Sequence, residues 1–340
     1  MKHTIDLSKY QVRTDLAIEA SENEEIKSET KIYNDIKVTK TKLNKNIAKK
    51  INKQEGTYFT IEFKDVTDTQ NRKNVISVLE KVIKEFLKIL NIKENDKCLI
   101  VGLGNKKSTP DSLGPLSIES ILVTRHLFLY DSPEEGFRNI SAITPGVTGE
   151  TGIETSDIIE ATVKSINPDF LIVIDALASR SIERINKTIQ LSDTGIHPGS
   201  GIGNKRKEIS NKSLGIPVIA IGVPTVVDAA TIVNDTIQYI HKHYAFHKNF
   251  SKNPMNNLIV SSQINYLKEN IKVTEDDKKN LLGIIGSLSE EETKQLLNEV
   301  LTPIGYNLMV TTKEIDFLIE NLSQVIASGI NQALHQNIKE

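Results

Sequence analysis

The 340-residue chain has a single cysteine, Cys98, and almost no net charge. One cysteine excludes an internal disulfide, and its position at the start of an apolar run is typical of a small buried side chain. This cysteine usage fits a reducing cytoplasm. The formal net charge of −2 lacks the strongly basic character of nucleic-acid-binding domains. We therefore expect no direct nucleic-acid partner.

Long apolar runs are also missing. The first residues, Met-Lys-His-Thr-Ile-Asp-Leu-Ser-Lys-Tyr, lack the apolar core of a secretory signal. No stretch approaches the ~18 consecutive apolar residues that a membrane span requires. The sequence therefore predicts a soluble, cytoplasmic protein without a membrane partner. With 38% hydrophobic residues, the chain is long enough to bury a sizeable core.

The middle of the chain alternates apolar runs with helical patterns. Continuous apolar runs at 99–103, 170–174 and 217–223 are typical of parallel strands covered on both faces. Between 75 and 90 apolar residues recur at helical spacing. This alternation predicts an α/β fold with a mainly parallel sheet and helices on both faces. Two further strands are predicted from alternating patterns, at 57–63 and 188–192.

The composition changes twice along the chain. Residues up to 54 are polar and lysine-rich, with weak periodicity. Residues 55–246 contain the alternating strands and helices, which predicts the α/β core. Residues 247–340 begin with a polar, linker-like stretch and continue with helical patterns. We expect a linker and C-terminal helices there, as an appendage that packs on the core.

Two glycines, Gly102 and Gly104, follow the first apolar run. A dinucleotide-binding turn needs a third glycine where Lys107 stands, and a phosphate loop needs a Gly-Lys-Ser/Thr sequence that is missing at this spacing. The support for nucleotide binding is therefore weak. A non-enzymatic α/β protein that binds a nucleotide or a peptide remains as an alternative function.

Two aspartates follow apolar runs, Asp111 after the glycine turn and Asp175 directly after 170–174. Because the carboxyl ends of parallel strands meet at one edge of a sheet, we expect both carboxylates there. Two carboxylates within a few ångströms share a proton, since both cannot ionise cheaply. One can then deprotonate water while its protonated partner polarises a carbonyl. For either aspartate alone, stabilisation of a turn is the alternative.

Several long motifs in the chain match one known family. They are Tyr10-Gln-Val-Arg-Thr-Asp-Leu-Ala-Ile-Glu19, Val101-Gly-Leu-Gly-Asn105, Thr109-Pro-Asp-Ser-Leu-Gly-Pro115, Thr124-Arg-His-Leu-Phe128, Gly152-Ile-Glu-Thr-Ser-Asp-Ile-Ile159, Ile174-Asp-Ala-Leu-Ala178, Gly195-Ile-His-Pro-Gly-Ser-Gly201, Gly222-Val-Pro-Thr-Val-Val-Asp228 and Leu308-Met-Val-Thr-Thr-Lys-Glu314. Through them the chain resembles, nearly end to end, the germination (spore) protease family, which degrades small acid-soluble spore proteins.

The resemblance implies an endopeptidase of an atypical aspartic class, with a fold similar to the hydrogenase maturation proteases. In that related group one acidic residue follows Gly-x-Gly-Asn and another ends a later strand, and Asp111 and Asp175 hold the corresponding places. A histidine joins the two acids there to hold a metal, and its counterpart here is His197, as a supporting residue. We expect no metal and no cofactor. A metal-assisted peptidase that uses Asp111, Asp175 and His197 is the alternative.

The resemblance also implies a self-processing zymogen. Members of the family assemble as homotetramers and remove their own propeptide, and their substrates are cut after the first acidic residue of a Thr-Glu-Phe/Ile-Ala-Ser-Glu sequence. Thr14-Asp-Leu-Ala-Ile-Glu19 is similar to this sequence, which implies cleavage between Asp15 and Leu16. The propeptide is then residues 1–15, followed by a polar N-terminal segment, 16–54. The implied location is the cytoplasm of the forespore and the spore core, after synthesis during sporulation.

Overall fold

The computed structural model describes residues 14–21, 26, 28–130, 133–196, 207–250, 266, 271–283, 286, 288, 290–301 and 308–338. The chain divides into two compact units. The described part of the larger unit lies within Arg13–Val227 and Thr311–Glu340, and that of the smaller unit lies within Asp228–Val310. The larger unit contains both predicted catalytic aspartates. The segment boundaries predicted after residues 15, 54 and 246 stay predictions.

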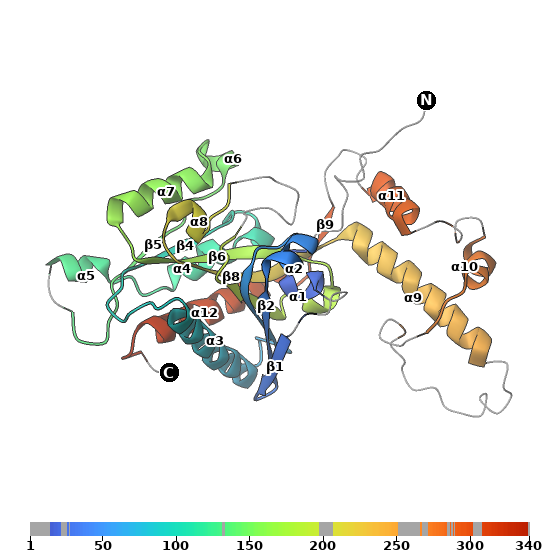
Figure 1. The fold of residues 1–340 in the computed structure, drawn as a ribbon, viewed down its shortest axis with the longest axis horizontal. Coiled ribbons are helices and arrows are strands. Elements are labelled where there is room, and N and C mark those ends of the chain that lie inside the picture. The colour runs from blue at the N-terminus through green and yellow to red at the C-terminus, as the bar shows by residue number, and fades with distance from the viewer. Residues whose placement is uncertain are drawn as a thin grey trace. The chain divides into compact units, whose positions relative to one another are not determined.

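One mixed sheet forms the centre of the larger unit (Figure 1). Its strands lie in the order β1-β2-β3-β7-β8-β6-β4-β5. Neighbours among β8, β6, β4 and β5 are parallel, and these strands are here called the parallel half. The remaining pairs are antiparallel, so β1, β2, β3 and β7 are called the antiparallel half. The strands are β1 (Ser28–Tyr33), β2 (Ile36–Leu43), β3 (Gly56–Glu62), β4 (Cys98–Gly102), β5 (Ile140–Ile143), β6 (Phe170–Ser179), β7 (Thr188–Ser192) and β8 (Val218–Asp228).

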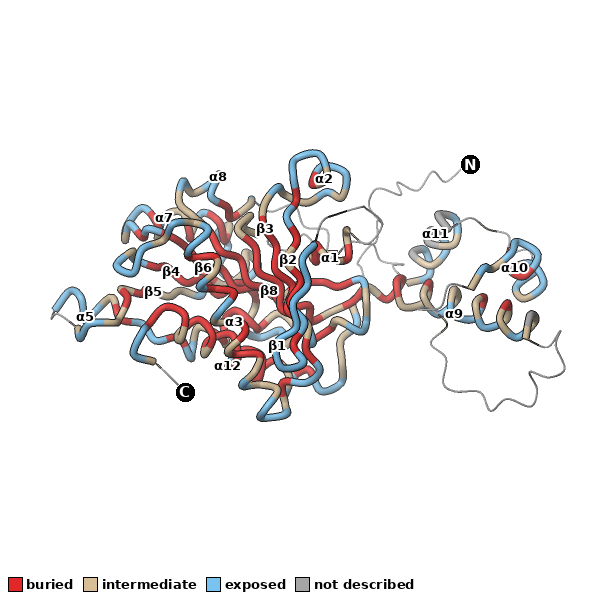
Figure 2. The backbone as a smooth tube through the Cα atoms, turned by 60° about the horizontal axis from the view of Figure 1, so that its bottom comes forward, coloured by how far each residue is buried: buried red, intermediate tan, exposed pale blue. Residues whose placement is uncertain are grey.

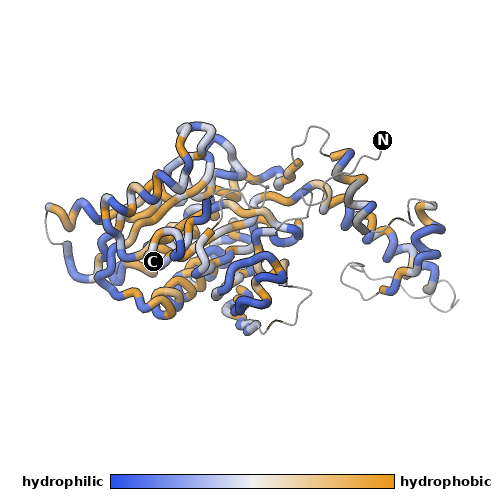
Figure 3. The backbone as a smooth tube through the Cα atoms, turned by 45° about the horizontal axis from the view of Figure 1, so that its top comes forward, coloured by the Kyte–Doolittle hydropathy of each residue, from blue (hydrophilic) through white to orange (hydrophobic). Residues whose placement is uncertain are grey.

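Helices cover both faces of this sheet. On one face α3 (Thr69–Ile89), α4 (Leu113–Glu119) and α12 (Ile315–Leu334) share an apolar core with alternate residues of β4 and β6. On the other face α7 (Thr155–Ile166) and α8 (Asn211–Leu214) pack on the intervening residues. Figure 2 shows β4, β6 and β8 buried, and Figure 3 shows apolar residues running through the central strands. The predicted α/β fold class is confirmed.

The last helix, α12, is part of the main core. Leu322, Val325 and Ile326 are all 0% exposed. A Cβ on Gly329 would lie 2.7 Å from the Leu79 side chain, so a larger residue there would push α12 away from α3. The shorter helical elements of the larger unit are α1 (Ala17–Ala20), α2 (Lys45–Lys50), η2 (Thr109–Asp111), α5 (Arg125–Tyr130), α6 (Thr148–Thr151) and η3 (Ile182–Arg184).

The smaller unit is helical. Its long helix α9 (Ala229–Phe250) contacts α10 (Glu275–Leu282) and α11 (Glu290–Leu301), and the short strand β9 (Met309–Val310) follows. The Phe246 and Phe250 rings stack with their centroids 5.4 Å apart. Lys248 Nζ lies 2.6 Å from Asp277 Oδ1 on α10. None of the helices in the described ranges has both the length and the apolar character that crossing a bilayer requires.

Candidate active site

The chain leaves β4 through a turn that requires glycine. Gly104 has a φ of +114°, and a Cβ on it would lie 2.0 Å from the carbonyl oxygen of Asp111. A Cβ on Gly102 would lie 2.4 Å from the carbonyl oxygen of Gly114, at the start of α4. Both glycines therefore allow close backbone packing.

Hydrogen bonds from its own loop and from β8 hold Asp111 and its neighbour Pro110 in place. Its Oδ2 accepts a hydrogen bond of 2.9 Å from the N–H of Asn105, and its own N–H donates to the Ser108 carbonyl at 2.8 Å. The Thr225 hydroxyl on β8 donates to the Pro110 carbonyl at 2.7 Å. The Asp111 side chain is half-buried. These bonds fix its position between the β4 turn and β8.

Asp175 lies on β6, opposite Gly222 of β8. It continues the alternation of Leu171 and Val173, which pack toward α7, so its side chain belongs to the same face of the sheet. Asp175 is only 6% exposed. Its Oδ1 accepts a hydrogen bond of 2.9 Å from the N–H of Ala176. The backbone therefore orients this buried carboxylate locally.

The structure brings the two aspartates to the same edge of the sheet. β4 ends at Gly102, which pairs with Ile174, and the following N–H, that of Leu103, donates to the Ile174 carbonyl at 2.8 Å. The turn that contains Asp111, η2, contacts β6. Asp111 therefore lies just beyond the end of β4, next to the part of β6 that contains Asp175.

Strand β6 is longer than the apolar run that predicts it. It continues to Ser179, which pairs with Val227 of β8 after a register shift between Leu177 and Ala178. The prediction that Asp175 ends its strand is therefore wrong. The reason is the partner strand, because β8 also continues beyond its apolar run and offers backbone groups for pairing. Residues 176–179 of β6 therefore extend beyond Asp175 and beyond the end of β4.

The N-terminal segment lies against this extension of β6. The N–H of Asp15 donates to the Ala178 carbonyl at 3.0 Å, and the Ala178 N–H donates to Asp15 Oδ2 at 2.9 Å. The Gln190 side chain, on β7, donates to the Asp15 carbonyl at 3.2 Å and accepts from the Ala17 N–H at 2.6 Å. The backbone on both sides of Leu16 is thus bound. We call residues 14–21 the docked segment.

The bond predicted to be cleaved is enclosed. Leu16, on its carboxyl side, is 0% exposed. Ala178, the partner of Asp15, lies three residues beyond Asp175, which is about 10 Å along a strand. Asp15, on the amino side of this bond, is therefore hydrogen-bonded to the strand that contains Asp175.

Lys53 adds a positive charge to this region. Its Nζ donates to the Thr14 carbonyl at 2.7 Å. Burial lowers the pKa of Lys53, and the negative charges of Asp15 and Glu19 oppose that shift. The ammonium group is thus stabilised by the acidic side chains of the docked segment.

Sequence analysis assigned no role to Gln190, Ser179 or Arg184, all of which contact the docked segment. Gln190 is a polar residue on a predicted strand, and its burial to 8% exposure cannot be inferred from its neighbours in the sequence. Ser179 and Arg184 belong to a polar stretch without periodicity. Only the fold reveals their positions next to the segment.

Two other candidates from the sequence have different outcomes. His197 lies outside the described residues. Within the part of the chain that the structure describes, no group of three or more His, Cys, Asp or Glu residues is placed to hold a metal ion. Cys98 is 1% exposed, and burial raises the pKa of its thiol, as expected for a structural cysteine.

The fold and the site define an α/β protein with two aspartates at a sheet edge and a segment of its own chain bound at the end of the strand that contains one of them. The chain belongs to the germination protease family, whose model matches residues 4–340. It is therefore a protease by family, and the predicted family is confirmed.

Known relatives match the chain over its whole length. Germination proteases from Geobacillus sp. (strain WCH70) and Priestia megaterium are 49% identical over 366 residues and 48% identical over 364 residues. Both alignments cover 100% of this chain and 98% of the relative. Among solved structures, a NiFe hydrogenase maturation protease from Thermococcus kodakarensis aligns with 42% of this chain and 80% of its own, at 15% identity and a TM-score of 0.28.

Proposed function

We propose that the chain is an endopeptidase of an atypical aspartic type in which Asp111 and Asp175 activate water. One observation supports this above all. The docked segment is bound at the end of β6, the strand that also contains Asp175 and that η2, with Asp111, contacts. The end of a strand that binds a peptide through backbone hydrogen bonds can present that peptide to carboxylates at the same end of the sheet.

In the proposed mechanism one aspartate accepts a proton from water as the water attacks the peptide carbonyl. The other aspartate, in its protonated form, donates a hydrogen bond to the carbonyl oxygen. Two neighbouring carboxylates favour this division, because repulsion between their charges leaves one of them protonated. The N–H groups of Asn105 and Ala176 orient one oxygen of Asp111 and of Asp175, respectively.

We further propose that the chain is a zymogen that cleaves itself between Asp15 and Leu16 and releases residues 1–15. The sequence Thr14-Asp-Leu-Ala-Ile-Glu19 and its binding along β6 support this. The proposed substrates are small acid-soluble spore proteins in the forespore and spore core, and the proposed assembly is a homotetramer. The relatives' name, germination protease, supports a role in germination.

The test compares the full-length chain with Asp111→Asn and Asp175→Asn on the peptide Thr-Glu-Ile-Ala-Ser-Glu. We expect each variant to lose cleavage by on the order of 10³-fold, since each removes an acid or base group. Mass spectrometry of the processed wild-type chain should show Leu16 as the new N-terminus.

The matched control is Asp169→Asn. Asp169 lies at the opposite end of β6, where its carboxylate accepts from the Lys97 N–H at 2.7 Å, and an asparagine oxygen can accept the same bond. This variant should cleave within about twofold of the wild-type rate. Wild-type cleavage by either active-site variant would remove that aspartate from the mechanism.

A further inference from the structure

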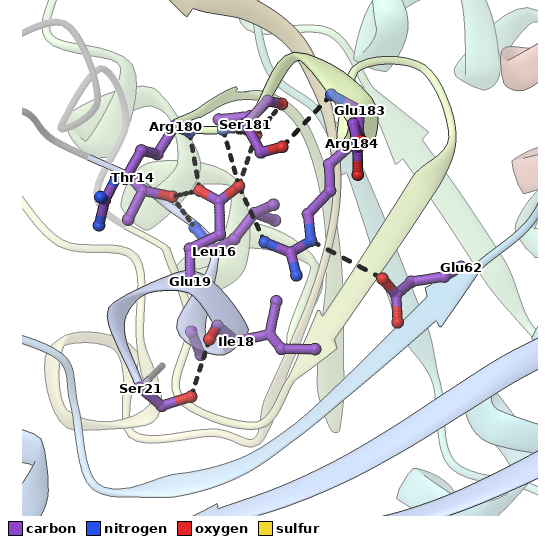
Figure 4. Close-up of polar contacts among 12 residues, drawn as sticks. Thr14, Leu16, Ile18, Glu19, Ser21, Glu62, Arg180, Ser181, Glu183 and Arg184 are labelled. Atoms are coloured by element: carbon purple, nitrogen blue, oxygen red, sulfur yellow. Dashed lines mark hydrogen bonds and ion pairs between the residues drawn. The ribbon is translucent and has the colours of Figure 1, made fainter. Parts of the chain in front are cut away.

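Glu19 of the docked segment is bound by a ring of donors (Figure 4). Its Oε1 accepts from the Ser179 hydroxyl at 2.8 Å, the Ser181 N–H at 3.0 Å and Arg184 Nη1 at 3.2 Å. Its Oε2 accepts from the Arg180 N–H at 2.7 Å. We call Ser179, Arg180, Ser181 and Arg184 the Glu19 pocket. Each of these four contacts is a donor to the carboxylate.

The pocket suits a charged side chain. The side chain of Glu19 is 1% exposed and that of Arg184 is 18% exposed. A carboxylate removed from water is tolerated only where hydrogen bonds and an opposite charge replace its hydration. Arg184 is itself positioned by the sheet, since its Nε lies 3.7 Å from Glu62 Oε1 at the end of β3. A neutral amide would lose the charge-assisted part of these bonds.

The pocket is built by its own hydrogen bonds. The Ser181 N–H lies 3.1 Å from the Ser179 hydroxyl, and the Ser181 hydroxyl accepts from the Glu183 N–H at 3.3 Å. The Arg184 N–H donates to the Ser181 carbonyl at 3.2 Å. These bonds lie within one turn, at the end of β6 and the start of η3. The turn is thus held by bonds of its own in addition to those that it makes to Glu19.

The docked segment presents its two acidic side chains at a fixed spacing. Asp15 bonds to Ala178, and Glu19, four residues later, fills the pocket. The Thr14 hydroxyl accepts from the Leu16 N–H at 3.1 Å and donates to Glu19 Oε2. This bend sets how far the second acidic residue lies from the first.

We propose that the Glu19 pocket is a peptide-binding subsite that selects an acidic side chain four residues after the one bonded to Ala178. The chain's own Glu19 fills the subsite, so the docked segment competes with any incoming peptide that has acidic residues at these two places. Naming a protein substrate as the source of that peptide rests on the proposed function. Cleavage after Asp15 leaves Glu19 in the chain, so the competition continues after processing.

The test measures binding without cleavage, in full-length chains that all contain Asp175→Asn. The probe is the fluorescein-labelled peptide Thr-Asp-Leu-Ala-Ile-Glu-Ala-Ser, the sequence of residues 14–21, and its analogue with Gln in place of Glu. Removing the competitor with Glu19→Gln should tighten binding of the acidic peptide by about tenfold. That chain should also prefer the acidic peptide over its analogue by on the order of tenfold.

Adding Arg184→Gln to Glu19→Gln should weaken binding of the acidic peptide by on the order of tenfold and abolish its preference. The two partners of one ion pair thus shift binding in opposite directions, which a merely structural role would not do. Arg184→Lys keeps the charge without the planar fork and should give an intermediate preference. Lys187→Gln, which removes a nearby exposed cation, should change neither affinity nor preference.

Equal binding of both peptides by the Glu19→Gln chain, or no gain in affinity from Glu19→Gln, would overturn the inference. Circular dichroism and thermal unfolding check that each chain is folded, and mass spectrometry checks that the peptide stays intact. Cleavage by the wild-type chain without any Glu preference in binding would reject the subsite alone. The expected preference without any cleavage by the wild-type chain would reject the peptidase proposal alone.

Discussion

The parallel and antiparallel halves of the sheet differ in how far they are enclosed. Every residue of β4, in the parallel half, is buried, because helices cover both of its faces. In the antiparallel half burial decreases outward, from the fully buried β7 to β1, of which every residue is exposed. The parallel half is thus a two-sided core, and the antiparallel half ends in a solvent-facing edge.

The two halves also hold different groups. The two proposed catalytic aspartates lie at the edge of the parallel half. The antiparallel half contributes Gln190, which bonds the docked segment directly, and Glu62, which faces Arg184 of the Glu19 pocket. We therefore expect substitutions next to the two aspartates of the parallel half to change the rate of chemistry. Substitution of Gln190 in the antiparallel half should change how firmly the segment is held, as the end of β6 also does.

Among the predicted changes in cleavage and stability, the largest is expected from Gly104→Ala, in the turn after β4. The new Cβ would collide with the Asp111 carbonyl at 2.0 Å and would strain a residue whose φ is +114°. We expect a loss of cleavage by on the order of 10²-fold, since small misplacements of a reacting group have large effects. Stability should fall by about 1–3 kcal/mol.

Peptide cleavage and urea unfolding measure these two effects. The control is Gly149→Ala in α6, where a Cβ would meet nothing within 4 Å. If Gly104→Ala cleaves as fast as this control, the turn does not position Asp111 for catalysis.

The second prediction concerns the antiparallel half, through Gln190→Leu. The change removes both bonds of the side chain to the segment and leaves the buried Ala17 N–H without its acceptor. We expect thermolysin to cut before Leu16 or Ile18 about tenfold faster, because the segment detaches more often. Cleavage of a saturating peptide substrate should keep its rate.

Gln70→Leu on α3 is the matched control, since the amide of Gln70 bonds only a neighbouring side chain of its own helix, that of Asn74. Equal thermolysin sensitivity of the two variants would contradict the holding role assigned to β7.

A smaller effect is expected from Thr225→Val on β8. The isosteric change removes the hydroxyl that donates to the Pro110 carbonyl at 2.7 Å, beside Asp111. We expect a loss of about 1 kcal/mol in stability and a drop in kcat of roughly threefold to tenfold. Thr162→Val in α7 removes a hydroxyl of the same kind, which donates to the Ile158 carbonyl. A kcat loss of equal size in both variants would argue against a specific tie between β8 and η2.

The smallest effect is expected from pH at the outer edge of the parallel half. Burial lowers the pKa of His335 below its usual 6.5, and the positive Arg138 lowers it further. Between the lowered pKa and 6.5 the unfolded chain binds a proton that the folded chain does not. The free energy of unfolding therefore decreases as the pH falls below about 6.5.

Urea unfolding at about pH 7.5 and about pH 5.5 measures this dependence. His335→Asn should reduce the difference between the two free energies of unfolding, because asparagine does not titrate there and can still accept from the Arg138 N–H. An unchanged difference would show that other groups dominate the acid sensitivity.

Much of the parallel half could be predicted because its signals are local. The run at 170–174 and the helical spacing from 75 to 90 correspond to parts of β6 and α3. In the antiparallel half, β7 coincides with the predicted strand at 188–192, and β3 overlaps the predicted strand at 57–63. In β2, by contrast, lysines alternate with buried threonines, so its period of two is hidden among polar residues. The antiparallel edge of the sheet was therefore not predicted.

The candidate site follows the same rule. Asp111 and Asp175 each follow an apolar run, so their common edge could be inferred from the strands that precede them. The Glu19 pocket could not be inferred, because Glu19 and Arg184 are separated by 165 residues and Arg184 stands in no recognisable pattern. The family motif identified residues 14–19 as a cleavage sequence but not as a bound one.

The amino-acid sequence by itself determined the family, the α/β class and the two aspartates at the sheet edge, since these depend on apolar periodicity and on motifs read along the chain. Only the tertiary structure decided that β6 continues past Asp175 and that the N-terminal segment is bound there. The physical reason is that strand pairing and buried ion pairs join residues far apart in sequence. Their free energy arises only when the folded chain removes both partners from water.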